Sequence, residues 1–333
     1  MGMAKRNIAP GGPFLFHESV VRYQHSYEEL VNRYDGRIFR RAIEAGGGLA
    51  LIEARAGGPT GGPAVDAGEV AVEAGEVALR VRVPGRMTKN IVGAGEAALR
   101  HLLAFDLDLE PFYAMARIDR VLAPIVRRFW GLRPVRYLTL FEALVTAITT
   151  QQVNLTFGGR IRARLVKRWG DKLTLGGEIH YAFPRPERLA RARAATLEGM
   201  QFSGRKAEYV IGVARAAAAG ELEGADYRDL PLEEAVERLT ALRGVGRWSA
   251  EQALYRGLGR IEALAAGDLG VQKVVARYCF GETRVDENRA REAARRWEPW
   301  GALAAAYLFA AWRAGIPSGA KAEAGTGTEI ETG

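Results

Sequence analysis

The stretch that decides the fold is Leu242-Arg243-Gly244-Val245-Gly246-Arg247-Trp248-Ser249-Ala250, which lies between two segments with helical spacing. Glycine tolerates positive φ and has no side chain, so Gly244 and Gly246 let the chain turn tightly and let another molecule approach the backbone. Amides of such a turn, and of the helix that follows, point at a phosphate, and the helix dipole adds to the attraction. Ser249 is a candidate N-cap of that helix. Two glycines also occur in helix–turn–helix connections for turn geometry alone, so the stretch by itself leaves both interpretations open.

Most of the chain after about Asp106 has the same helical character as the two segments beside this stretch. Apolar residues recur three and four positions apart, as in helices that bury one face. Short turns with Gly or Pro separate these segments. The predicted helices span residues 113–129, 139–150, 156–169, 206–218, 232–242, 250–257, 271–279, 288–297 and 301–314.

The first third of the chain reads differently. Apolar residues alternate partly in Leu49–Arg55 and clearly in Glu76–Val83, which predicts two strands. Segments Tyr27–Ala45 and Lys89–Phe105 have helical spacing, and the Gly/Pro-rich stretch Gly57–Gly68 predicts an exposed loop. The predicted fold is therefore mostly α, with a smaller N-terminal α+β domain in residues 1–105. A helical region follows in residues 106–316, with the hairpin at 242–250, and a disordered tail in 317–333.

The composition narrows the function classes. The formal net charge is +8 and the pI about 9.7, which suits a polyanionic partner, although an Arg-rich composition can also reflect genome bias. Cys279 is the only cysteine, and the four histidines are scattered, so we expect no disulfide, iron–sulfur cluster or metal centre built from side chains. No apolar run reaches membrane-spanning length, and the start lacks a signal-peptide core. We expect a soluble, intracellular protein.

Two further motifs accompany the hairpin. About twenty residues after it comes Ala265-Ala266-Gly267-Asp268-Leu269-Gly270-Val271-Gln272-Lys273, and upstream lies Phe141–Val153, which ends in Gln151-Gln152-Val153. Together the three motifs closely resemble the helix-hairpin-helix (HhH-GPD) base-excision DNA glycosylases, within which the 3-methyladenine DNA glycosylase II (AlkA-like) group fits best. The resemblance covers most of residues 14–316. It implies a helical glycosylase core in two halves behind a small α+β domain, and excision of damaged bases from DNA.

Asp268 is the residue that this resemblance makes catalytic. Cleavage of an N-glycosidic bond builds positive charge on the sugar, and a fixed carboxylate can stabilise that charge and orient or deprotonate the attacking water. The alternative is an aspartate that caps the helix starting near Leu269, a very common role. The two roles are compatible, because a cap position would also hold the carboxylate in place.

The tryptophans bear on reaction type and on the base pocket. In the strand-cleaving branch of the superfamily a lysine stands at the place of Trp248 and forms a Schiff base; an indole cannot, so the resemblance implies hydrolysis without lyase activity. Trp248 is expected to line the base pocket, where its electron-rich face attracts an alkylated, cationic base, or else to pack between helices. Trp300 resembles a second pocket aromatic, although Trp297 could take that part or belong to the core. Leu269 and Gln252 replace aromatics found in some relatives, which leaves the substrate range open.

The remaining site residues are predicted to hold DNA. Gln151 and Gln152 resemble the turn of this family that approaches the lesion and supports the base stack once a base has been extruded. Gln151 is the expected substrate-binding residue of the two. The alternative is that both are solvated, as glutamines at the end of a helix often are. Lys206, beside Arg205, is a candidate phosphate contact, or one of a solvated pair. The expected DNA-binding residues are Gly244, Val245, Gly246, Arg247, Ser249, Gln152 and Lys206.

The predicted function is hydrolysis of flipped-out alkylated bases, of the 3-methyladenine or 7-methylguanine type, to leave an abasic site in base excision repair. Two alternatives stay open: a glycosylase of this fold for an oxidised or deaminated base, and a protein that only grips DNA structures. Asp268 argues against the second, since a carboxylate near DNA repels phosphate. We expect a monomer on damaged double-stranded DNA, associated with the nucleoid, and no cofactor except a monovalent cation that backbone carbonyls of the hairpin could hold.

Overall fold

The computed structural model describes residues 1–23, 28–57 and 76–318. The predicted loop beyond Gly57 and the predicted tail beyond Ser318 lie outside the described residues. The described chain forms two compact units. Unit 1 comprises residues up to 108 together with 131–260, and unit 2 comprises 109–130 and 261–318. None of the described helices is long and apolar enough to cross a membrane.

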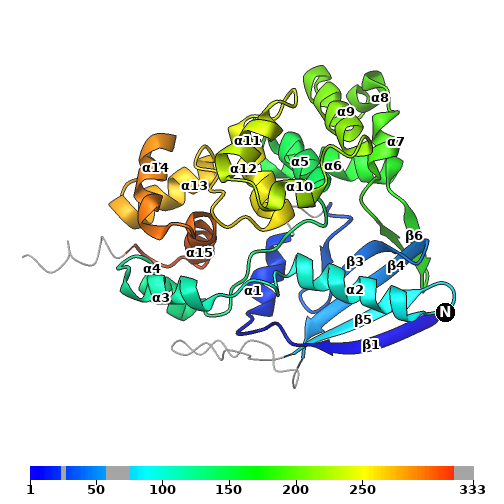
Figure 1. Cartoon of the computed structure of the whole chain (residues 1–333), viewed down its shortest axis with the longest axis horizontal. Helices are drawn as coiled ribbons and strands as arrows, with labels where there is room; N and C mark the ends of the chain where they lie inside the picture. Colours follow the sequence, from blue (N-terminus) through cyan, green and yellow to red (C-terminus); the bar gives the residue numbers. More distant parts are fainter. Residues whose placement is uncertain (24–27, 58–75, 319–333) are drawn as a thin grey trace, which may run out of the picture. The chain divides into compact units, whose positions relative to one another are not determined.

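Unit 1 contains an antiparallel sheet with strand order β1-β5-β4-β3-β2. Its inward residues alternate with outward ones, as on a half-buried sheet. Helix α2 (Lys89–Leu102) lies along the inner face of the sheet, capped at its start by Thr88, whose hydroxyl accepts from the Ile91 amide (Figure 1). The strands are β1 (Gly2–Ile8), β2 (Arg33–Tyr34), β3 (Phe39–Ala45), β4 (Gly48–Ala56) and β5 (Val77–Val83).

The sheet confirms the strands predicted at Leu49–Arg55 and Glu76–Val83, and α2 confirms the helix predicted from Lys89. The helix predicted at Tyr27–Ala45 is wrong, because its described part carries β2 and β3. The alternation of β3 is disguised by Arg41, which stands on the buried face between Phe39 and Ile43. A charge at that place hid the strand pattern.

Arg41 is held by a buried ion pair. Its Nη1 and Nη2 donate to Oε1 and Oε2 of Glu142 at 3.0 and 2.6 Å, and Nη1 also donates to the Asn32 side chain at 2.6 Å. Both charged side chains are at most 3% exposed. Glu142 belongs to α5 (Leu140–Thr150), so this bidentate pair ties the sheet to the helical part of unit 1.

The helical part of unit 1 follows most of the predicted segments. Helices α5, α6 and α9 begin at the polar N-caps Thr139, Asn154 and Ser203, whose side chains accept backbone amides. The hairpin β6 (Lys172–Leu175) and β7 (Glu178–Tyr181), which the helical pattern did not predict, packs on the outer face of the sheet. The other elements are α1 (Phe16–Val20), η1 (Val21–Tyr23), α6 (Leu155–Trp169), α7 (Pro186–Ala190), α8 (Ala194–Glu198), α9 (Gly204–Ala218), α10 (Gly224–Arg228), α11 (Leu232–Thr240), α12 (Arg247–Ala253) and the π-helical η2 (Leu254–Leu258).

Unit 2 is built from two segments that are far apart in the sequence. The first carries α3 (Glu110–Ile118) and α4 (Leu122–Arg128), where one helix was predicted. Asp119 separates them, because its Oδ1 accepts the amides of Val121 and Leu122. The second segment carries α13 (Leu269–Val275), the π-helical η3 (Ala276–Phe280), α14 (Glu287–Ala294), η4 (Arg295–Trp297) and α15 (Gly301–Arg313).

Candidate functional site

The hairpin stretch connects α11 and α12 through two glycines in different conformations. Gly244 has φ +88°, and a Cβ there would stand 2.0 Å from Cγ of Tyr209, so glycine is required by both backbone and packing. Gly246 has φ −88° and is the N-cap of α12, and a Cβ there would meet nothing within 4 Å. The free protein therefore has room for a side chain at Gly246, and with glycine at this position the backbone of the turn is exposed to solvent.

Ser249 does not cap α12. The N-cap is Gly246, which offers no side-chain acceptor, and Ser249 is the third residue of the helix. Its side chain is 1% exposed, and its Oγ accepts a hydrogen bond from Nε2 of Gln151 at 2.9 Å. The predicted capping role is therefore wrong, and a contact of Ser249 with DNA could be made only by its backbone N–H.

Gln151 ties the end of α5 to the hairpin. Its Nε2 donates to Oγ of Ser249 and to the carbonyl of Gly244, both at 2.9 Å, which uses both hydrogens of the amide. The backbone carbonyls of Gln151 and Thr149 in turn accept from Nζ of Lys206, at 2.6 and 3.3 Å. Lys206 thus completes the C-terminus of α5, and burial lowers the pKa of its ammonium group.

The neighbouring Gln152 has the opposite character. It is exposed and has φ +52°, the left-handed region that non-glycine residues seldom adopt. The two glutamines of the predicted turn are therefore separated by environment: Gln151 is fixed inward and Gln152 stands at the surface.

Arg247 is engaged by carboxylates. Its Nη1 and Nη2 donate to Glu233 at 2.8 and 2.6 Å, and its Nε donates to the buried Glu251 at 2.9 Å. The hydrogen bonds that Arg247 donates to Glu233, together with the charge of Glu251, raise the pKa of this guanidinium, although burial opposes them. Trp248, the next residue, is half-buried at the start of α12.

Asp268 is the N-cap of α13. Its Oδ1 accepts the amides of Gly270 and Val271 at 2.8 and 3.2 Å, so the capping role is observed. A Cβ on Gly270 would come within 2.9 Å of both that oxygen and Cζ of Phe309, so glycine is needed beside the carboxylate. The half-buried carboxylate is thus fixed in one orientation at the N-terminus of α13.

The two C-terminal tryptophans have different surroundings. Trp297 is 0% exposed, and its Nε1 donates to Oδ2 of Asp119 at 2.9 Å, so it belongs to the core of unit 2. Trp300 is half-buried at the N-cap of α15, with its ring 5.8 Å from that of Phe112. Helix α15 packs against α13, so unit 2 brings Trp300 and Asp268 onto neighbouring helices.

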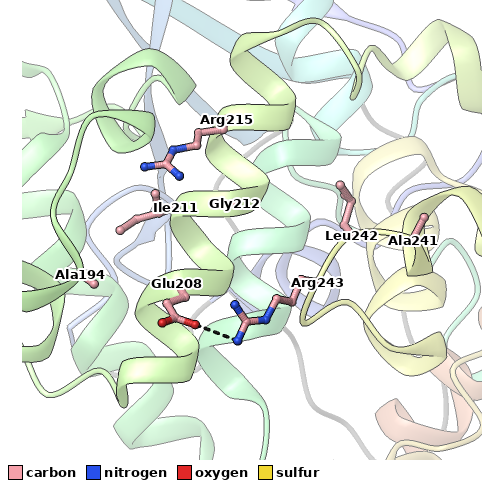
Figure 2. A pocket seen from close by; sticks show the side chains of 8 residues that line it. All are labelled: Ala194, Glu208, Ile211, Gly212, Arg215, Ala241, Leu242 and Arg243. Carbon is pink, nitrogen blue, oxygen red and sulfur yellow. Dashed lines mark ion pairs between the residues drawn. The ribbon is translucent and has the colours of Figure 1, made fainter.

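A cavity of about 380 Å³ opens beside the start of the hairpin stretch. Figure 2 shows its lining from α9 and from Ala241 to Arg243, with the Arg243 guanidinium directed at the Glu208 carboxylate, 3.0 Å away. Neither Trp248 nor Asp268 lines this cavity, so it is not the predicted base pocket.

The predicted site residues fall into two groups, one in each unit. Unit 1 holds the hairpin, both glutamines and Lys206; unit 2 holds Asp268 and Trp300. The sequence reasoning missed Tyr209, which fills the space under Gly244, and Glu251, whose spacing of four residues from Arg247 on one helix was the available signal. Within the described ranges, no three His, Cys, Asp or Glu side chains are grouped as metal ligands would be.

Comparison with known proteins agrees with this fold. Residues 145–299 match the family described as "HhH-GPD superfamily base excision DNA repair protein". The DNA-3-methyladenine glycosylase of Bacillus subtilis (strain 168) is 33% identical over 207 residues, which are 62% of this chain and 68% of that protein. DNA-3-methyladenine glycosylase 2 of Escherichia coli (strain K12) is 28% identical over 65% of this chain and 72% of its own length.

A solved structure, the 3-methyladenine DNA-glycosylase from Archaeoglobus fulgidus, superposes with a TM-score of 0.76 at 25% identity, and the match covers 93% of this chain and 98% of that one. The chain therefore belongs to the HhH-GPD superfamily of base excision DNA repair proteins, and within it to the DNA-3-methyladenine glycosylase II group.

Proposed function

We propose that this protein is a monofunctional DNA glycosylase that hydrolyses the N-glycosidic bond of alkylated bases, of the 3-methyladenine or 7-methylguanine type, and leaves an abasic site. The observation that carries the proposal is the carboxylate of Asp268, which two backbone amides hold at the N-terminus of α13. Relatives named DNA-3-methyladenine glycosylases support the class of substrate.

The proposed step needs one carboxylate and one water. As the bond between C1′ and the base nitrogen breaks, the base departs with the bonding electrons, and a cationic alkylated base leaves as a neutral one. Asp268 stabilises the positive charge on the sugar and accepts a proton as the water oxygen bonds to C1′. Two amide hydrogen bonds restrict the carboxylate to one orientation, which lowers the reorganisation that the step requires.

The residue types at the hairpin and at α15 agree with hydrolysis of a cationic base. Trp248 has no amine, so it cannot form the Schiff base that strand cleavage requires. We assign Trp248 and Trp300 to the base pocket, where their aromatic faces attract the positive charge of an alkylated ring.

The proposed DNA contacts are mostly backbone contacts. Val245 is buried and its N–H donates to the Leu242 carbonyl, so this residue would shape the turn and not hold the phosphate itself. The side chain of Ser249 is occupied by Gln151, so Gly244, Gly246 and Ser249 would meet a phosphate through backbone N–H groups at the turn and the start of α12. The exposed Gln152 is the glutamine of the turn that can enter the opened stack, while Gln151 holds the hairpin and carries less of the substrate contact than its sequence position suggests. We propose a monomer acting on double-stranded DNA, in the cell at the nucleoid.

The proposed reaction uses no cofactor. A monovalent cation at the hairpin would be held by backbone carbonyl oxygens that already accept one hydrogen bond each. The carbonyl of Gly244 accepts from the Gln151 side chain, and the carbonyl of Leu242 accepts from the Val245 amide. Each carbonyl oxygen has a second lone pair, so these two groups could hold such an ion. It would add positive charge close to the bound phosphate.

The test is base release from methylated DNA by Asp268→Asn. The amide oxygen of asparagine can still accept both backbone hydrogen bonds, so the cap is kept and only the charge is lost. We expect single-turnover release of 3-methyladenine to fall by about 10²–10⁴-fold. Asp286→Asn is the matched control, because Asp286 caps α14 through the Arg289 amide at 2.8 Å and should leave release unchanged. Undiminished release by Asp268→Asn would remove the catalytic assignment.

The absence of lyase activity has a separate test. The purified protein is incubated with abasic DNA under neutral conditions, and borohydride is added to trap any Schiff base. We expect neither strand nicking nor a trapped covalent complex, because Trp248 replaces the amine nucleophile. Efficient nicking would show that another amine of the chain does this chemistry.

A further inference from the structure

The outer face of the five-stranded sheet carries a row of basic side chains. The strand registers place Lys5 opposite Arg80, Arg80 opposite Glu53, Glu53 opposite Arg40, and Arg40 opposite Arg33. The row therefore crosses all five strands at one level, with four cations and one carboxylate. We call these five residues the basic row.

Arg82 and Arg55 stand on the same face, one level to either side of the basic row. Side chains two positions apart on a strand point to the same face, so Arg82 shares the face of Arg80 on β5, and Arg55 shares the face of Glu53 on β4. Arg55 and Lys5 are exposed, and the side chains of Arg80 and Arg33 are each 42% exposed.

The charges on this face are not balanced within the described residues. Glu53, 8% exposed, lies 3.4, 3.5 and 3.6 Å from Arg40, Arg82 and Arg80, so one carboxylate serves three guanidinium groups. Asp35 binds Arg40 at 2.5 Å and Glu178 lies 3.9 Å from Arg33. Glu44 also stands on this face of β3, where it is paired with Arg185 from outside the sheet. The strands contribute six cations to the face, which exceed these four carboxylates: Lys5, Arg33, Arg40, Arg55, Arg80 and Arg82.

Two of the four neighbouring pairs in the basic row are pairs of like charges. Lys5 and Arg80 are directly opposite each other on neighbouring strands, and so are Arg40 and Arg33. Like charges in that position destabilise a sheet. A bound polyanion would offset this repulsion, because its negative charges attract both cations of each pair.

The dimensions of the basic row suit a nucleic-acid backbone. Neighbouring strands lie about 4.8 Å apart, so five strands span roughly 19 Å. A duplex carries one phosphate charge per about 1.7 Å of axis, which gives on the order of ten charges over that length. The apolar part of the outer face, at Ala42 and Leu51, is covered by the β6–β7 hairpin, so the basic part is what this face offers to a partner.

We propose that the basic row is a second DNA-binding surface, which contacts phosphates of the duplex independently of the hairpin glycines. This inference rests on the proposed function in one respect, the choice of DNA as the polyanion. The row reads no sequence and touches no base; it adds salt-dependent affinity for any duplex and holds the enzyme on DNA while it searches.

The test compares two double variants on an undamaged 30-base-pair duplex by fluorescence anisotropy between 50 and 300 mM KCl. Lys5→Gln/Arg80→Gln removes two cations of the row. Lys89→Gln/Arg100→Gln removes one lysine and one arginine from α2 on the other face of the same sheet. Arg100 is a close match for Arg80, since it is 44% exposed and also paired with a glutamate, Glu96.

We expect the row variant to lower the slope of log K against log salt by about 1.8, the value for two lost phosphate contacts. Its Kd should rise on the order of tenfold at 150 mM salt, while the α2 variant stays close to wild type. Equal effects of the two variants would overturn the proposal, because they would reflect net charge alone. Arg55→Gln, a substitution of an exposed residue, provides a second measurement. It should lower the slope of log K against log salt by about 0.9, the value for one lost phosphate contact.

Stability and base release separate this proposal from the others. The row variant should unfold in urea at a midpoint close to that of the wild type, because it removes the like-charge pair of Lys5 and Arg80 together with the contact of Arg80 with Glu53. Its single-turnover base release at saturating enzyme should be unchanged. If the wild type releases no alkylated base, the proposed function fails, and the salt slopes on undamaged duplex still decide the role of the basic row.

Discussion

Gly244 and Gly246 stand two residues apart, and the structure gives them different tasks. At Gly244 the positive φ and the ring of Tyr209 both exclude a side chain. At Gly246 neither the backbone nor any neighbour in the free protein does. Packing therefore explains the first glycine, and for the second we propose that a DNA phosphate approaches the backbone.

Alanine substitutions should separate these tasks. Gly246→Ala should change the free energy of unfolding by no more than about 1 kcal/mol, the usual range for a helix N-cap. It should weaken DNA binding at least tenfold, because the new Cβ would stand where we propose that a phosphate approaches. Gly244→Ala should lower the free energy of unfolding by about 2 kcal/mol or more. Urea unfolding and fluorescence anisotropy measure the two quantities.

Gly93→Ala provides the control, since its Cβ would also meet nothing within 4 Å and it is an exposed residue inside α2, which is not part of the hairpin. It should bind DNA as wild type does and be slightly more stable. If Gly246→Ala bound DNA equally well, the bare backbone at the start of α12 would have no part in binding.

At the scale of elements, the pair Arg41–Glu142 carries the connection between β3 and α5. Arg41→Met should lower the free energy of unfolding by about 3–5 kcal/mol, because it leaves the Glu142 carboxylate buried without its counter-charge. Arg41→Met/Glu142→Leu should recover much of that loss. Chemical denaturation of the single and double variants checks this; a double variant no more stable than the sum of its parts would contradict it.

The buried Arg41 of this pair also explains why one of the strands could not be predicted from the sequence. The long helices α5, α6, α9 and α15 were predicted to within two residues at each end. Strand β3 was missed because Arg41 occupies a buried position that alternation assigns to an apolar residue. Strands β6 and β7 are four residues each, too short for a periodicity to stand out among helices.

The candidate site also has features that the local sequence predicts and features that depend on contacts between distant residues. The hairpin turn and the capping aspartate follow from local residue types, Gly244, Gly246 and Asp268. The bond from Gln151 to the hairpin joins positions 93 and 98 residues apart, and no local pattern encodes it. The burial of Ser249 is equally non-local, which is why its capping role was predicted wrongly.

At the scale of the whole molecule, unit 2 depends on two distant segments. Residues 109–130 contribute Phe112 and Tyr113, whose rings meet Trp300 and Tyr307 from the second segment. Asp119 of the first segment receives the indole N–H of Trp297 from the second. The buried side chains of each segment therefore pack against residues of the other segment, and both segments must be present for unit 2 to form its core.

A chain that ends at residue 260 should therefore expose the apolar faces of α3 and α4. We expect it to bind the dye ANS strongly and to elute as soluble aggregates in size-exclusion chromatography. The control replaces residues 109–130 of that fragment by a short Gly/Ser linker. The two ends lie close, because the Arg133 guanidinium donates to the carbonyls of Ala104 and Leu107. We expect this control to be monodisperse; equal ANS binding by both fragments would contradict the argument.

The divided origin of unit 2 has a consequence for how the protein is made. A ribosome adds about 5–20 residues per second, so the nearly two hundred residues between Tyr113 and Tyr307 take roughly 10–40 seconds to synthesise. The sheet and α2 can pack while the chain is still growing, since their residues have all emerged early. Phe112 and Tyr113 of α3 meet Trp300 and Tyr307 only when translation is almost finished. The unit that holds Asp268 is thus the last part of this protein to take shape in the cell.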